Sequence, residues 1–132
     1  MAKLLVLSVL SHQALWLAQA AICLPFVVSA LMKSVNREAA LKEMAAGGLP
    51  RSTTLLGTVV LVQAAAVLLI LTGLSPVGGA LLLIGFMTVA TVKYHAFWLV
   101  RGAPRLVKVN HFAENVALIG ALVLIALIGV QP

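Results

Sequence analysis

The chain has 132 residues, of which 63% are hydrophobic and only 9% are charged, and its mean hydropathy is +1.17. Soluble domains carry about 25% charged residues, so this composition excludes an ordinary soluble protein. The net charge of +6 would suggest a nucleic-acid partner in a soluble chain, but the basic residues gather in two short segments between long uncharged runs, which argues against nucleic-acid binding.

The first element that we predict is a membrane-spanning helix over residues 5–32. Residues 4–32 contain no Asp, Glu, Lys or Arg, and about 20 helical residues are enough to cross a hydrocarbon core of about 30 Å. Lys3, the apolar residues after it and the Ala-Gln-Ala at residues 18–20 imitate a secretory signal. The apolar run continues without a break to Met32, which a removed signal would not need, so we expect an uncleaved first span.

The next segment, residues 33–51, is polar and is expected to contain a short amphipathic helix with the sequence REAALKEMAA. Asn36 can cap the start of this helix, and Gly47 and Gly48 can end it. Its apolar face would hold Leu41, Met44 and Ala45. A helix this short is marginal in water, so we expect it to lie on the membrane surface or against the bundle.

Residues 52–92 form an uncharged run about two spans long, and TGLSPVGG at residues 72–79 divides it. Gly and Pro end one helix there, and Pro76 is placed to begin the next. The last uncharged run, residues 115–132, is long enough to span if its helix begins a few residues earlier. The predicted spans are residues 5–32, 54–72, 76–98 and 111–130. We therefore expect a single all-α domain over residues 1–132, a four-transmembrane-helix bundle with a short helix in its first loop.

The positions of the basic residues predict the orientation. Residues 33–51 and 93–108 hold every Lys and Arg except Lys3. Basic loops of membrane proteins usually face the cytoplasm, where anionic lipid headgroups attract them. We predict a multi-pass protein of the plasma (inner) membrane, with these two loops in the cytoplasm and both termini outside.

Polar residues inside the spans indicate which helix faces look inward, because an unpaired polar group in lipid is costly. Gln19 and Gln63 should lie at similar depth near the midplane, where a hydrogen bond between them would contribute about 0.6 to 2 kcal/mol. Contact with a quinone or a substrate is the alternative role of this pair. Cys23 is the only cysteine, so an internal disulfide, a thiol relay and a cysteine metal site are excluded.

Unusual polar and aromatic residues converge on the cytoplasmic end of the predicted bundle, namely Lys33, Lys93, Tyr94, His95, Trp98, His111 and Glu114. One interpretation is an interfacial belt, in which Glu114 pairs with Lys33, Lys93 or a histidine. The second is a proton-handling or quinone-headgroup site, with His95 or His111 as the titrating group. A metal held by two histidines and one carboxylate is the third, but the spacing of these residues is not diagnostic, and we predict no metal site.

Several segments, in this order and spacing, resemble the DoxX family. They are Lys33, GGLP at 47–50, LLILTGL at 68–74, YHAFW at 94–98 and NHFAENVALIGALVLIAL at 110–127. The resemblance covers about residues 15–128. It implies a small four-helix protein of bacterial and archaeal plasma membranes, associated with membrane oxidoreductase systems that include quinone-linked sulfur oxidation. Distant relatives with the same helix plan are membrane chaperones or cargo receptors.

The chain departs from the family pattern in its first two spans. Similar sequences usually carry an arginine and a glutamate where this chain has Gln19 and Gln63. A charge pair is thus replaced by a neutral pair, which removes an obvious proton carrier. Ala30 also stands where a glycine is common. The residues that match the pattern, and that the resemblance implies to be functional, are Lys33, His95, Trp98 and Asn115.

We therefore expect a small subunit beside a membrane oxidoreductase or a quinone-linked system. Quinone or a partner protein would meet a rim formed by Lys33, His95, Trp98, His111, Glu114 and Asn115. The alternative is a non-catalytic assembly factor or receptor. A small transporter is less favoured, because the first span has no carboxylate that could couple protons to transport. No motif assigns a catalytic residue, and the glycines of the spans permit a homo-oligomer.

Overall fold

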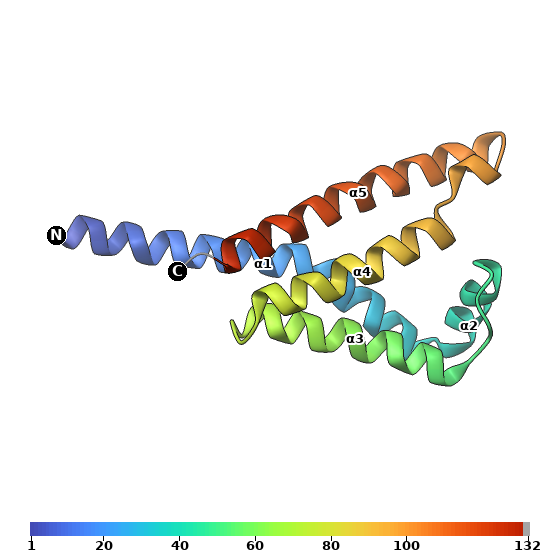
Figure 1. Cartoon of the computed structure of the whole chain (residues 1–132), viewed down its shortest axis with the longest axis horizontal. Helices are drawn as coiled ribbons and strands as arrows, with labels where there is room; N and C mark the ends of the chain where they lie inside the picture. Colours follow the sequence, from blue (N-terminus) through green and yellow to red (C-terminus); the bar gives the residue numbers. More distant parts are fainter. Residues whose placement is uncertain (131–132) are drawn as a thin grey trace.

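The computed structural model describes residues 1–130, and all regular structure in that range is helical. The elements are α1 (Ala2–Val35), α2 (Arg37–Ala46), α3 (Thr53–Leu71), α4 (Pro76–Tyr94), the 3-10 turn η1 (Phe97–Leu99) and α5 (Ala103–Gly129). Helices α1, α3 and α5 and the segment from α4 to η1 are long and apolar enough to cross a membrane. The predicted all-α fold with four membrane-spanning helices is confirmed, and so is the short helix in the first loop (Figure 1).

The long helices run back and forth along the long axis of the molecule (Figure 1). Helix α1 packs on α3, α3 on α4, and α4 on α5, whereas α1 and α5 share a much smaller interface. Helix α2 and the α4–α5 connection lie at one end, while the N-terminus and the C-terminal end of α5 lie toward the other. The two basic segments therefore share one end of the molecule. That this end faces the cytoplasm stays a prediction.

The break between α3 and α4 forms as the sequence predicts. Thr72 follows the end of α3, and Gly73 takes a positive φ of 74°, which glycine adopts without strain. Ser75 then caps α4, because its side chain accepts a hydrogen bond from the backbone N–H of Gly78 at 3.2 Å, and Pro76 occupies the first turn.

The two largest differences between predicted and observed helix boundaries are at the end of α4 and the start of α5. Helix α4 ends at Tyr94, and after two non-helical residues the turn η1 continues to Leu99, so the apolar span but not the α-helix reaches residue 98. Helix α5 begins at Ala103 rather than at residue 111. Its start is fixed by Gly102, which has a φ of +80°, and by a proline in the first turn, so the helix includes basic residues that we had placed in the loop.

Helix α1 is much longer than the helices that it packs against. It has 34 residues, and α3 has 19, which correspond to lengths of about 51 Å and about 28 Å. Figure 1 shows its N-terminal half extending past the rest of the bundle. The bundle begins near Trp16, whose indole N–H donates a hydrogen bond to the backbone oxygen of Leu71 at the end of α3, at 3.0 Å.

The main core lies where all four long helices meet. Its buried residues are Cys23, Phe26, Ala66, Val67, Ile70, Ala80, Leu83, Met87, Leu122 and Ile125. Gly79 makes the close approach of α3 and α4 possible, because a Cβ atom at this position would lie 2.5 Å from the backbone oxygen of Ala66. The two helices are therefore in backbone contact near the turn that joins them.

Helix α2 belongs to a second, separate apolar cluster. Ala40 and Met44 are buried against Leu56 of α3, so α2 lies against the bundle, which was one of the two placements expected. Leu41 packs at the edge of this cluster, as predicted. Ala45, which we predicted on the apolar face, is exposed. Ala40 is buried in its place, one turn before Met44, on which the packing of α2 is centred.

Candidate functional site

A cavity of about 300 Å³ lies between the two apolar clusters, at the basic end of the bundle. Its polar lining residues are Ser29, Lys33, Glu43, Tyr94, His95 and Asn115. Its apolar lining residues are Ala40, Met44, Leu49, Leu55, Leu56, Val59, Phe86, Met87, Val89 and Ala90. The cavity thus has apolar walls, with hydrogen-bonding groups gathered toward the end that α2 covers.

Lys33 supplies the positive charge of the cavity. Its ammonium group donates a hydrogen bond to the hydroxyl of Ser29, one turn earlier on α1, and lies 6.0 Å from the centre of the Phe86 ring. No carboxylate lies within salt-bridge distance of Lys33 among residues 1–130. Because an ammonium group has further donors beyond the one that Ser29 uses, Lys33 can also bind an acceptor in the cavity.

Glu43 is a lining residue that sequence analysis missed. It lies on α2, whose acidic residues we had treated only as parts of a polar loop. The spacing of Ala40, Glu43, Met44 and Gly47 follows one helix face. That spacing shows that Glu43 shares a helix face with the buried Met44. It does not show which part of the bundle this face contacts, so it could not identify the site.

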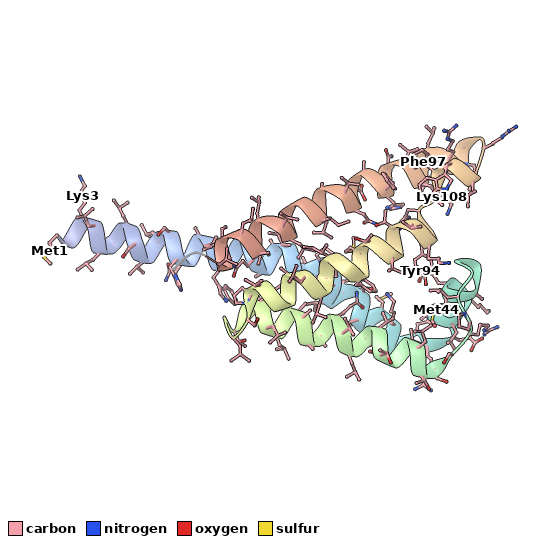
Figure 2. All side chains as sticks on the ribbon, in the orientation of Figure 1. Met1, Lys3, Met44, Tyr94, Phe97 and Lys108 are labelled. Carbon is pink, nitrogen blue, oxygen red and sulfur yellow. The ribbon has the colours of Figure 1, made fainter. Side chains whose placement is uncertain are left out.

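Tyr94 joins the end of α4 to the end of α2. A Cβ atom on Gly47 would lie 2.5 Å from Cε1 of Tyr94, so the ring rests directly on the backbone of Gly47. The backbone oxygen of Tyr94 accepts a hydrogen bond of 2.7 Å from Nζ of Lys108 on α5. Figure 2 shows Tyr94 and Met44 at the same end of the molecule, on α4 and α2. These contacts cover the polar end of the cavity.

The two histidines lie side by side, but only one of them lines the cavity. The ring centres of His95 and His111 are 5.2 Å apart. His111 is exposed, and its Nδ1 lies 3.3 Å from Oε2 of Glu114, so a histidine is the one of the three expected partners that Glu114 contacts. Among residues 1–130, no three His, Cys, Asp or Glu side chains are close enough together to hold a metal ion.

Asn115 and Trp98 have different positions. The side-chain amide of Asn115 donates a hydrogen bond of 3.1 Å to the hydroxyl of Thr91, which fixes Asn115 at the junction of α4 and α5, against the cavity. Trp98 is 51% exposed and packs edge to face on Phe97 and Phe112, away from the cavity. Of the six rim residues that we predicted, the cavity brings together Lys33, His95 and Asn115, and leaves Trp98, His111 and Glu114 outside.

The predicted hydrogen bond between Gln19 and Gln63 is absent. Gln63 is 0% exposed, and neither its side-chain nitrogen nor its oxygen has a hydrogen-bond partner among the described residues. Gln19 is half-buried on α1, and that the two glutamines lie at the same depth stays a prediction.

Comparison of the chain with protein-family models, curated proteins and solved structures gave no match. The DoxX resemblance therefore stays a prediction from motifs. The chemistry of the cavity is the remaining basis for proposing a function. Lys33, Tyr94 and Asn115 are hydrogen-bond donors, and Ser29 and His95 can donate or accept. Glu43 adds an acceptor, and the remaining wall is apolar. Such a cavity fits an amphiphilic molecule with acceptor oxygens on its polar part.

Proposed function

We propose that the chain is a DoxX-like protein of the plasma membrane, a small subunit beside a membrane oxidoreductase, which binds a quinone headgroup. The observation that carries this proposal is the cavity of about 300 Å³ in which Lys33, Tyr94 and His95 face apolar walls. A quinone ring is flat and apolar and has carbonyl oxygens that accept hydrogen bonds. Its chemical requirements therefore match both parts of the lining.

The roles of the residues follow from their chemistry. Lys33 and Tyr94 would donate hydrogen bonds to the carbonyl oxygens of the headgroup, and these bonds strengthen as negative charge develops on the oxygens. His95 can accept or deliver a proton at the same end of the cavity. The apolar walls, with Phe86 and Met87, would hold the ring and exclude water. The partner oxidoreductase would supply the electrons.

The second candidate is a non-catalytic assembly factor or receptor, and one feature favours it. The N-terminal half of α1 extends past the bundle, and its large apolar side chains are exposed, with Leu4 and Leu5 among them. Such a helix can pack against a membrane partner. On this alternative the protein forms a stable complex and binds no quinone.

The test is equilibrium binding of a decyl-substituted benzoquinone to the protein in lipid nanodiscs, with protein-free nanodiscs as the blank. We expect saturable binding, and we expect Lys33→Met to weaken it about tenfold, as the loss of one charge-assisted hydrogen bond predicts. Lys93→Met is the matched control, because Lys93 is exposed at the same end of the bundle and does not line the cavity. Absence of saturable binding, or equal weakening by both substitutions, would reject the proposal.

A further inference from the structure

Helices α3 and α4 form a wedge that opens toward the basic end. They are in contact at Gly79, where a Cβ atom would lie 2.5 Å from the backbone oxygen of Ala66. About two turns further along, Val59 of α3 and Phe86 of α4 both line the cavity. Figure 1 shows the two helices separating progressively from the turn that joins them toward α2. The cavity therefore occupies the wide part of this wedge.

The cavity reaches the outer surface of the bundle between these two helices. Val89 of α4 lines the cavity and is also 57% exposed. Opposite it, Leu55 and Val59 of α3 line the cavity and are half-buried. The wall is apolar from the interior to the surface along this path. Both helices belong to segments that can cross a membrane, so in a bilayer this opening would face hydrocarbon.

Contacts with the other helices border the remaining sides. On the α2 side, Tyr94 rests on Gly47. On the α5 side, the Asn115–Thr91 hydrogen bond joins α5 to α4. On the α1 side, the rings of Phe26 and Phe86 pack edge to face with their centres 6.3 Å apart. The polar groups of the cavity do not lie along the apolar path between α3 and α4, and Lys33 also borders a second cavity of about 270 Å³ between α1 and α2.

We propose that the occupant of the cavity enters laterally from the bilayer, between α3 and α4, and keeps its hydrocarbon chain between Val59 and Val89 while its headgroup lies at Lys33. This inference rests on the proposed function and specifies its ligand class. The ligand is a membrane-dissolved amphiphile with a long chain, such as a tailed quinone. The chain remains in contact with lipid, so the site exchanges its ligand with the membrane.

The test compares a benzoquinone that has no tail with its decyl derivative, in nanodiscs, on the whole protein. Val89→Trp places a large ring in the opening, and we expect it to weaken binding of the decyl probe at least about tenfold more than binding of the tail-less probe. Val92→Trp is the matched control, since Val92 lies on the same helix, is 53% exposed and does not line the cavity. It should leave the ratio of the two affinities unchanged.

The outcomes separate this inference from the proposed function. If the unaltered protein binds neither probe, both are overturned. If it binds both, and Val89→Trp leaves the ratio of affinities unchanged, the lateral entry alone is overturned. If the variant fails to fold, photolabelling of the unaltered protein still tests the lateral entry. A decyl probe with a photoreactive group at its chain end should label residues 55–59 or 86–90, and labelling confined to α2 or to the α4–α5 connection would overturn the inference.

Discussion

Replacing Gln63 by leucine should raise the free energy of unfolding. The side chain of Gln63 is fully buried on the face of α3 that also holds Ala66 and Val67, and its amide makes no hydrogen bond among the described residues. Each unpaired buried polar group costs about 1 to 3 kcal/mol. Leucine is larger than glutamine by about one methylene and has no polar atoms, so the substitution removes this cost and leaves no cavity. We expect a gain of about 1 to 3 kcal/mol.

The assay is reversible unfolding in mixed micelles by titration with a denaturing detergent, followed by circular dichroism. Thr91→Val serves as a contrasting control, because the hydroxyl of Thr91 accepts a hydrogen bond from Asn115 at 3.1 Å. Its removal should lower the free energy of unfolding by about 1 kcal/mol, so the two changes have opposite signs. A Gln63→Leu protein less stable than the unaltered one would refute the reasoning and would mean that the amide is paired in the folded protein.

Two glycine substitutions test the helix contacts. In the same detergent titration, Gly79→Ala should destabilise the protein by about 1 to 3 kcal/mol, because its Cβ would lie 2.5 Å from the rigid backbone at Ala66. Gly85→Ala should stabilise α4, because no atom lies within 4 Å of the position of its Cβ. Equal effects would contradict the close approach. Gly47→Ala would push its Cβ to 2.5 Å from the Tyr94 ring, so we expect trypsin to cleave the α2 segment faster, while Gly85→Ala leaves the rate unchanged. An unchanged rate in both variants would show that this contact does not hold α2.

The four spans could be predicted from the sequence because each uncharged run, with the middle run divided at residues 72–79, is about as long as a helix must be to cross a bilayer. The prediction failed at the start of α5 because we equated helix with apolar run. A helix continues as long as its backbone hydrogen bonds can form, and Arg105 and Lys108 extend α5 beyond the apolar part. The better signal was the Gly102-Ala103-Pro104 sequence, which is typical of a helix start.

The candidate site was predictable only in part. Lys33, His95 and Asn115 were foreseeable as residues at one end of the bundle, since chain topology and span length fix the end to which each belongs. Glu43 lines the cavity only because α2 packs on Leu56, and no local sequence pattern indicates this tertiary contact. The relative depth of Gln63 likewise depends on the register of α1 and α3, and apolar runs determine such a register only loosely.

The length of α1 has a consequence for the membrane itself. A bilayer matched to the 19 residues of α3 would leave most of the first half of the 34-residue α1 outside the hydrocarbon, although this half is apolar around nearly its whole circumference. A thicker bilayer, or a steep tilt of α1, removes this exposure of apolar surface to water. The short helices and the long one therefore favour different membrane thicknesses, and the lipid around this protein is expected to be deformed unevenly, most strongly beside the N-terminal half of α1.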